Sequence, residues 1–212
     1  MEILKEISDM IQKGKAQTVK ELVEKAIAEK IPAKKILDEG LLSAMNIVGV
    51  KFKNNEVFVP EVLIAARAMN AGTTVLKPYL VKDGVKPIGK AVVCTVKGDL
   101  HDIGKNLVRM MLEGAGLEVV DLGVDASPEK VVDAIKETEA TVVCLSALLT
   151  TTMTAQKDII EAIKAAGLRN KVKVMVGGAP VTSAYAKEIG ADSYTPDAAS
   201  AAEVAKSYFV KK

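Results

Sequence analysis

The second half of this sequence alternates short apolar, β-branched segments with longer amphipathic ones. Each short segment has the composition of a buried strand, and each longer one repeats its apolar residues at helical spacing. Such alternation requires right-handed crossovers and predicts an α/β fold with a mostly parallel, doubly wound sheet. Ser127 before Pro128 is the clearest helix start, with Ser127 as the cap. The predicted strands are 90–96, 117–122, 141–146, 172–176 and 192–194, and the predicted helices are 103–114, 128–138, 153–166, 182–189 and 198–210.

The chain from Met1 to about Val81 shows only helical spacing. Its apolar residues form four stripes, which are separated at Gly14, at Pro32 and just before Pro60. Both prolines fit the first turn of a helix, where the missing N–H is harmless. Because the connections are short, we expect an antiparallel four-helix bundle.

A polar segment with two glycines and a proline, residues 81–89, separates these two patterns. We expect this segment to be an interdomain linker. The predicted domains are therefore 1–86 and 87–212.

The loop before Pro60 places bulky apolar residues where a solvated turn is expected. Phe58 is one of three phenylalanines in the chain, and Val59 follows it. Two interpretations are open. The pair packs into the bundle and staples the start of the fourth helix, or it projects from the bundle and covers a ligand held by the second domain.

Composition excludes several classes of protein. Apolar residues make up 49% of the chain but aromatic residues only 3%, so an aliphatic core of helices and parallel strands is expected. The net charge of +2 comes from interspersed acidic and basic residues, which disfavours nucleic acid and anionic membranes as partners. Cys94 and Cys144 lie in strand-like runs, where we expect reduced, buried thiols.

The sequence also bears on location. No apolar run approaches the roughly 20 residues that a membrane span needs. The N-terminus alternates charged and apolar residues and does not resemble a signal peptide. We therefore expect a cytoplasmic protein that does not associate with membranes.

The loops after the predicted strands meet at one edge of the sheet, where open α/β sheets bind ligands. The first loop carries Asp99, His101 and Gly104, and the third strand is followed by a run of hydroxyl residues at 150–152. The fourth strand is followed by Gly177-Gly178-Ala179-Pro180, which is small enough for a flat ligand to lie against the backbone. Together they predict a slot lined by small and polar residues.

His101 is the only histidine in the chain. Asp99 can accept a hydrogen bond from its Nδ1–H and leave Nε2 free, an arrangement found behind metal-binding histidines. With no second histidine or paired cysteine nearby, a metal would have one nitrogen ligand, which suits a metal already held by a macrocycle. Alternatively, the pair could activate Ser146 or Thr152 as a nucleophile, but Gly-x-Ser-x-Gly and an oxyanion hole are lacking.

Three motifs carry a family resemblance. Asp99-x-His101-x-x-Gly104, Ser146-x-Leu148 and Gly177-Gly178 resemble the signature of cobalamin-binding domains that bind the cofactor with its own benzimidazole displaced. The N-terminal helices and residues 57–61 resemble the helical cap domain of the same, methionine-synthase-like proteins. In length and domain order the chain is similar to the corrinoid proteins of methylamine, quaternary-amine, methanol and methoxyaromatic methyltransferase systems. Residues 121–125 and 177–181 most resemble the methylamine branch.

The resemblance implies a cobalamin (corrinoid) cofactor bound base-off/His-on, with a flavodoxin- or Rossmann-like fold for the B12-binding domain. His101 would be the lower axial ligand of cobalt, Asp99 its hydrogen-bond partner, and Thr152 the next link towards solvent, where many relatives have serine. The cap over the methyl-bearing face would consist of Phe58, Val62, Leu63, Ala66 and Met69. The remaining cofactor-binding residues would be Gly98, Leu100, Asp102, Ile103, Gly104, Ser146, Leu148, Thr150, Gly177, Gly178, Ala179, Tyr194 and Thr195.

The resemblance also implies a function. The chain would accept a methyl group on cobalt from a substrate:corrinoid methyltransferase and pass it to a second methyltransferase that serves tetrahydrofolate or coenzyme M. A reductive activation protein would be a further partner, and the segment 81–89 would be the hinge. A cobalamin sensor or storage protein without methyl turnover is the alternative. A dinucleotide-binding domain is disfavoured because the first loop lacks Gly-x-Gly-x-x-Gly.

Overall fold

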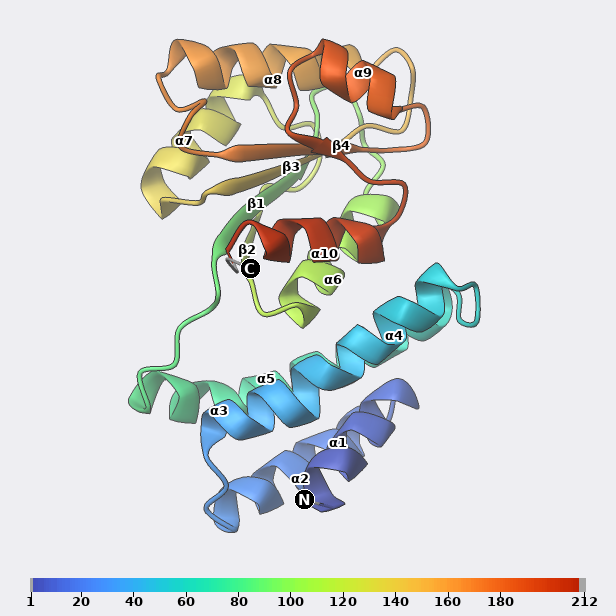
Figure 1. Ribbon diagram of the computed structural model, residues 1–212, viewed down its shortest axis with the longest axis vertical. Helices are drawn as coiled ribbons and strands as arrows, with labels where there is room; N and C mark the ends of the chain where they lie inside the picture. The colour runs from blue at the N-terminus through green and yellow to red at the C-terminus, as the bar shows by residue number, and fades with distance from the viewer. Residues whose placement is uncertain (1, 210–212) are drawn as a thin grey trace. The chain divides into compact units, whose positions relative to one another are not determined.

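Apolar residues at three- and four-residue spacing fold the N-terminal part into helices, and the strand–helix alternation folds the rest around a sheet (Figure 1). The computed structural model describes residues 2–209. The predicted end of the last helix at Val210, the start of the first predicted domain at residue 1 and the end of the second at residue 212 lie outside the described residues. The chain divides into two compact units, of which the first ends at Pro87 and also includes Gly114–Gly116, and the second comprises the rest from Ile88 onward.

The first unit is helical, as the sequence predicts. Its apolar faces pack together, with fully buried side chains such as Ile7, Val23 and Leu76. Its elements are α1 (Glu2–Gln12), α2 (Ala16–Ala28), α3 (Ala33–Lys35), the π-helical segment η1 (Ile36–Leu42), α4 (Ser43–Lys53) and α5 (Val59–Lys82).

The third predicted helix is one continuous run of α3, η1 and α4. In η1 the backbone N–H of Ser43 donates to the carbonyl of Asp38, five residues earlier. The wider turn places Ile36 and Leu41, also five residues apart, in the core with no exposed surface. Apolar spacing alone does not reveal this change of helical register.

The helix α5 ends later than the sequence predicts, and the predicted linker therefore starts two residues too early. Val81 and Lys82 belong to α5, which runs through Pro78. The helix stops where Gly84 adopts a left-handed conformation with φ +68°, and Val85 N–H donates to the carbonyl of Leu80. The segment between the last helix of one unit and the first strand of the other is thus 83–89.

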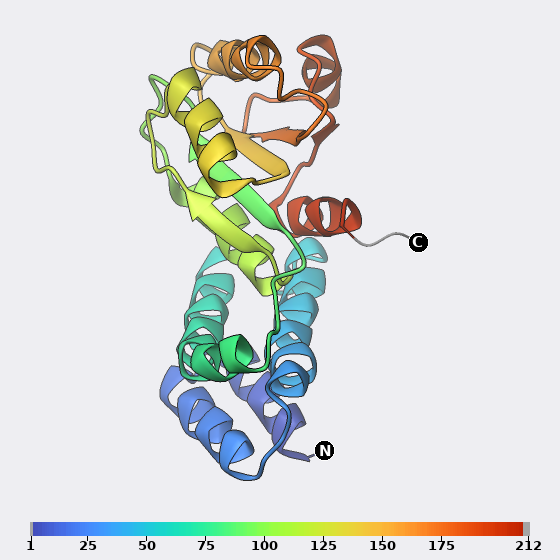
Figure 2. The same cartoon turned by 90° about the vertical axis from the view of Figure 1, so that its left-hand side faces the viewer.

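The second unit is a five-stranded parallel sheet with strand order β2-β1-β3-β4-β5, which confirms the doubly wound α/β fold. Helices α7, α8 and α9 cover one face, and α6 and α10 cover the other (Figures 1 and 2). The strands are β1 (Lys90–Thr95), β2 (Glu118–Asp121), β3 (Val142–Ser146), β4 (Lys173–Gly177) and β5 (Ser193–Tyr194), and the helices are α6 (Ile103–Gly114), α7 (Pro128–Thr138), α8 (Thr154–Ala165), α9 (Ser183–Glu188) and α10 (Ala198–Ser207).

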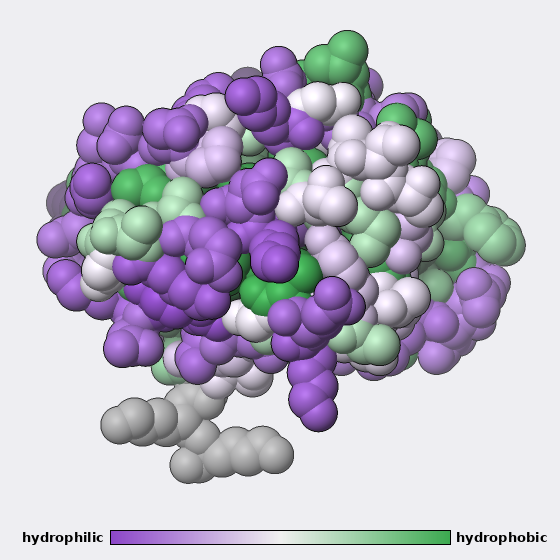
Figure 3. Space-filling model, turned by 90° about the horizontal axis from the view of Figure 1, so that it is seen from above, coloured by the Kyte–Doolittle hydropathy of each residue, from purple (hydrophilic) through white to green (hydrophobic). Residues whose placement is uncertain are grey.

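Local signals set the helix starts and the core. The Ser127 hydroxyl accepts from Lys130 N–H at the start of α7, which confirms the predicted cap. Cys94 and Cys144 are buried and unbonded to each other, and burial raises the pKa of both thiols to about 12. The outer side of α8 and α9 is mainly hydrophilic, with only small separated apolar patches (Figure 3). Within residues 2–209 no helix has the length and apolar character of a membrane span.

The strand register fixes where the loops begin. Thr95, Ser146 and Gly177 are direct neighbours on β1, β3 and β4, so the three central strands end in one row. Gly178, the next residue along from Gly177, has φ +129°, a conformation that side chains with a Cβ rarely adopt. Any Cβ there would also overlap the carbonyl of Ala147. The backbones of the β3 and β4 loops therefore touch, with no side chain between them.

Replacing Gly178 by alanine is predicted to destabilise the protein by about 3 kcal/mol or more, because left-handed strain and backbone overlap add together. Gly167→Ala is the matched control, since Gly167 also has a positive φ, +70°, but open space around its Cβ position. It should cost only about 1 kcal/mol. Urea unfolding of both variants measures the difference. Equal decreases in the free energy of unfolding would show that the overlap with the Ala147 carbonyl does not destabilise the protein.

Candidate functional site

The centre of the site is the carboxylate of Asp99, in the loop between β1 and α6. Asp99 is 1% exposed. Its Oδ1 accepts from the backbone N–H of His101 at 3.1 Å and contacts His101 Nδ1 at 2.7 Å. Its Oδ2 accepts from the backbone N–H of Leu148 and from the hydroxyl of Thr152, both at 2.7 Å. The β1 and β3 loops are thus joined through one buried side chain.

These partners decide the charge of Asp99. Burial by itself raises the pKa of Asp99. The hydrogen bonds from Leu148, Thr152 and His101 lower the pKa by more than burial raises it, so the pKa of Asp99 lies well below its usual range. The carboxylate is therefore ionised at neutral pH and acts only as an acceptor. It follows that His101 Nδ1 carries a proton and donates to Asp99.

The other ring nitrogen of His101 is available for a ligand. The side chain is 53% exposed, and among residues 2–209 no hydrogen-bond partner of Nε2 is present. With the proton on Nδ1, the Nε2 lone pair is free to coordinate a metal. No group of three or more histidine, cysteine or acidic residues that could hold a metal ion occurs in the described part of the chain. A metal here would receive one protein nitrogen and would need its other ligands from elsewhere.

Two residues that the sequence analysis did not predict as part of the site also hold this loop. The hydroxyl of Thr95 donates to the carbonyl of His101 at 2.8 Å. The carboxylate of Asp125 accepts from Gly98 N–H at 2.7 Å, and Asp125 N–H donates to the carbonyl of Asp99 at 3.1 Å. A polar residue at the end of an otherwise apolar strand was the available signal for Thr95. The roles of the Leu148 and Asp125 backbone groups have no signal in the sequence.

The predicted loop residues after the other strands lie at the same edge. Ser146 pairs with Gly177 in the sheet, and Tyr194 pairs with Val176. A Cβ at Gly177 would lie 3.7 Å from the carbonyl oxygen of Thr195. Thr150 and Ala179 belong to the loops after β3 and β4, but within residues 2–209 neither forms a hydrogen bond with this group.

The rim of the site has apolar surface and unfilled space. Leu100 and Ile103, on either side of His101 in sequence, are 73% and 72% exposed, and Leu148 is 42% exposed. A Cβ on Gly104 would meet nothing within 4 Å, so packing within the protein does not require glycine there. Exposed apolar side chains beside open space are typical of a surface that binds a large, partly apolar ligand.

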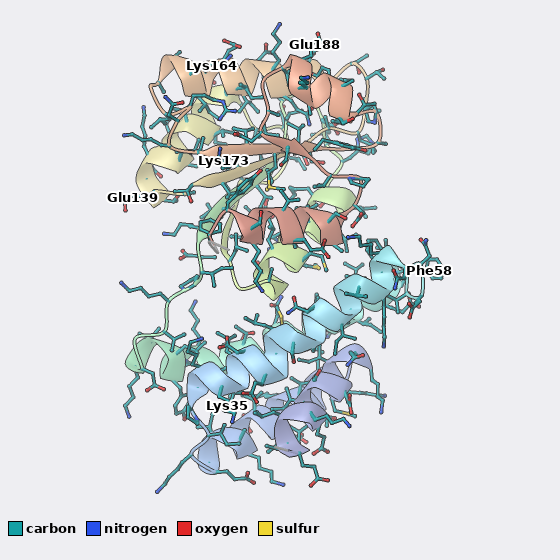
Figure 4. The ribbon with its side chains drawn as sticks, viewed as in Figure 1. Lys35, Phe58, Glu139, Lys164, Lys173 and Glu188 are labelled. Carbon is teal, nitrogen blue, oxygen red and sulfur yellow. The ribbon has the colours of Figure 1, made fainter. Side chains whose placement is uncertain are left out.

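The predicted cap residues belong to the helical unit. Phe58 is 63% exposed at the turn between α4 and α5 (Figure 4), where its N–H donates to the carboxylate of Glu61. For Phe58 the interpretation that it packs into the bundle as a staple is therefore wrong, because most of its side chain is exposed. Leu63 is 36% exposed, whereas the other three predicted residues, Val62, Ala66 and Met69, are buried.

Comparison with known proteins gives consistent results. Two families described as B12 binding domains match the chain, one over residues 3–77 and the other over residues 89–204. The chain is 46% identical to dimethylamine corrinoid protein 3 of Methanosarcina acetivorans, over 96% of this chain and 95% of that protein.

Two solved structures are similar over almost the whole chain. The methanol:cobalamin methyltransferase complex MtaBC from Methanosarcina barkeri contains a chain with a TM-score of 0.89 and 29% identity, covering 100% of this chain and 81% of that one. A cobalamin-binding protein from Desulfitobacterium hafniense has a TM-score of 0.80 and 33% identity, covering 98% of both chains.

Asp99→Asn is predicted to destabilise the protein at neutral pH by about 3 kcal/mol. The NH₂ group of asparagine would replace one carboxylate oxygen and would face N–H or O–H donors that then have no acceptor. The folded pKa of Asp99 is lowered, so its contribution is present above the unfolded value of about 3.9 and is lost as pH falls. The gap between parent and variant should therefore narrow from about pH 5 to pH 2. Denaturant unfolding across this range measures it.

The exposed carboxylate of Asp133 on α7 provides the control. Asp133→Asn should change the free energy of unfolding by less than about 0.5 kcal/mol. If the difference in free energy of unfolding between the parent and Asp99→Asn is the same at every pH, the ionised form of Asp99 does not stabilise the fold.

Proposed function

This chain belongs to the B12-binding family, and from that membership we propose that it is a corrinoid protein that carries a methyl group between two methyltransferases. The observation that carries the proposal is the pair formed by Asp99 and His101, which leaves one imidazole nitrogen free at the ligand-binding edge of the sheet. Relatives named dimethylamine and trimethylamine corrinoid proteins, at 46% and 42% identity, support it.

The residues fit a corrinoid. A macrocycle supplies the equatorial ligands of its metal, which matches a site with one histidine nitrogen and no cluster of three or more metal-binding side chains among the described residues. The open space at Gly104 and the exposed side chains of Leu100 and Ile103 leave room and apolar contact surface beside that donor. We propose binding in the base-off/His-on mode, with His101 Nε2 as the lower axial ligand of cobalt.

When bound, the corrinoid supplies a cobalt centre that takes up and releases the methyl group. Asp99 keeps the proton on His101 Nδ1, which orients the ring and makes Nε2 a better donor. Thr152 holds Asp99 from the other side, and the carbonyl of Leu149, 3.1 Å from the same hydroxyl, is a second acceptor that shares its single proton. We propose that Thr152, which is only partly buried, links the pair to solvent for proton exchange.

The remaining site residues follow the same proposal. The corrin would contact the loop after β1, and the nucleotide tail would lie along the ends of β3, β4 and β5. The exposure of Phe58 and Leu63 supports a role as the cap over the methyl group, and we propose that the buried Val62, Ala66 and Met69 contribute to the cap through the packing of α5. The tail residues are Ser146, Leu148, Thr150, Gly177, Gly178, Ala179, Tyr194 and Thr195.

We further propose that residues 1–86 and 87–212 act as separate domains and that the segment 83–89 is the hinge between them. Such a hinge would let each methyltransferase reach the cofactor in turn. A methyltransferase specific for a methylamine would be the donor, a tetrahydrofolate or coenzyme M methyltransferase the acceptor, and a reductive activation protein the third partner. The cytoplasm is the proposed location, since it keeps the two free thiols reduced.

Axial ligation can be tested on one atom, because His101 is the only histidine in the chain. Protein grown on ¹⁵N-histidine, reconstituted with cobalamin and reduced to the cobalt(II) state, should show two-line nitrogen splitting in its EPR spectrum. Unlabelled protein should show the three-line splitting of ¹⁴N. The same labelled sample of His101→Ala should lose the two-line pattern.

The alternatives give different spectra. A three-line pattern in the labelled protein would mean that the axial nitrogen comes from the corrinoid's own base. Loss of all nitrogen splitting would mean that no nitrogen occupies the lower position. Either result would overturn ligation by His101.

Phe58→Ala is predicted to speed oxidation of the reduced cobalt form by dissolved oxygen several-fold, because the exposed ring would no longer shield the reactive face. Absorbance spectroscopy follows the rate. Val81→Ala is the control: Val81 is 72% exposed at the opposite end of α5, about 35 Å away along the helix. Equal rates for Phe58→Ala and the parent would remove Phe58 from the cap.

A further inference from the structure

Thr95 is a polar residue in a place that normally takes an apolar one. It is the last residue of β1, follows four buried apolar residues, and has no exposed surface. Valine would fill the same volume and has a higher preference for strands. A buried hydroxyl needs a hydrogen-bond partner, and the partner of Thr95 lies outside the sheet.

That partner is the backbone carbonyl of His101, which accepts from Thr95 Oγ1 at 2.8 Å. Both backbone polar groups of Thr95 are themselves hydrogen-bonded to the segment that follows β2. Its N–H donates to the carbonyl of Gly123, and its carbonyl accepts from Ala126 N–H, both at 3.0 Å. The hydroxyl therefore projects from a fixed backbone position at the end of β1.

Both polar backbone groups of His101 are thus held from different elements. Asp99 accepts from its N–H at 3.1 Å, and Thr95 donates to its carbonyl. Asp99 also holds the ring through Nδ1. The backbone and the ring of His101 are therefore both restrained. The position of Nε2 relative to the sheet then depends on the position of Thr95 at the end of β1.

We propose that Thr95 is a positioning residue for His101, whose hydroxyl holds the imidazole at the depth required for coordination. The proposal rests on the proposed function, because it assumes that His101 binds the metal. Thr95 itself touches no substrate or cofactor in this scheme. Its effect passes through the His101 carbonyl.

The geometry predicts that this role is separable from folding. Without the hydroxyl, the His101 carbonyl could bond to water, since the neighbouring Leu100 and Ile103 side chains are exposed. The other anchor of the loop, from Asp125 to Gly98 N–H, would remain. Loss of the hydroxyl should therefore loosen the His101 segment while the sheet stays intact.

Two matched pairs of variants test the proposal: Thr95→Val against the parent, and Thr95→Ala against Thr95→Ser. Each pair differs at the hydroxyl, and the second pair serves if Thr95→Val does not fold. In the protein without cofactor, hydrogen exchange of the 98–104 segment should be several-fold faster in the variants that lack the hydroxyl. Cobalamin affinity should fall about tenfold in them, the range seen for partners of metal ligands. Their two-line ¹⁵N splitting should weaken as well.

The outcomes separate this proposal from the one on which it rests. If the labelled parent shows no two-line splitting, ligation by His101 fails whatever Thr95 does. If the parent shows it, and the hydroxyl-lacking variants match their partners in exchange, affinity and splitting, the role of Thr95 is overturned. Faster exchange with weaker affinity and splitting, restored in Thr95→Ser, supports it.

Discussion

A buried carboxylate that meets four donors is the interaction on which the site depends. Asp99 is removed from water, and an ionised group in that position is tolerable only because backbone and side-chain donors replace its hydration. The donors come from the loops after β1 and β3, so the same charge ties these loops together. It also decides which nitrogen of His101 is protonated. The ionised Asp99 carboxylate therefore both joins the two loops and leaves Nε2 of His101 free for a ligand.

The parallel sheet makes this arrangement possible. Its register aligns the ends of β1, β3 and β4, so that short loops from three crossovers reach one edge. Thr95, Ser146 and Gly177 stand at equivalent positions but differ in size and polarity. The hydroxyl of Thr95 is directed to the first loop, whereas the glycines after β4 let backbone approach backbone. A uniform apolar end to the strands would give the same fold without these functions.

Much of this could be predicted from the sequence, because the signals were local. The five strands, the helices of the second unit and the Ser127 cap follow from spacing and turn residues, and the two-residue step from Asp99 to His101 predicted their hydrogen bond. The π-helical register at Ile36 and Leu41, the bonds from Leu148 N–H and the anchoring by Thr95 depend on packing between distant segments. The interpretation of Phe58 as a packed staple was wrong, because an apolar residue beside a helix start is equally consistent with an exposed surface residue.

If the chain carries an activated methyl group, as proposed above, the burial of its two cysteines has a chemical consequence. A thiolate is the side chain that would most readily become methylated by such cargo. Cys94 and Cys144 are sealed in the sheet, and burial keeps both sulfurs protonated at any physiological pH. The apolar core that holds the strands together would thus also protect these thiols from methylation in the proposed methyl carrier.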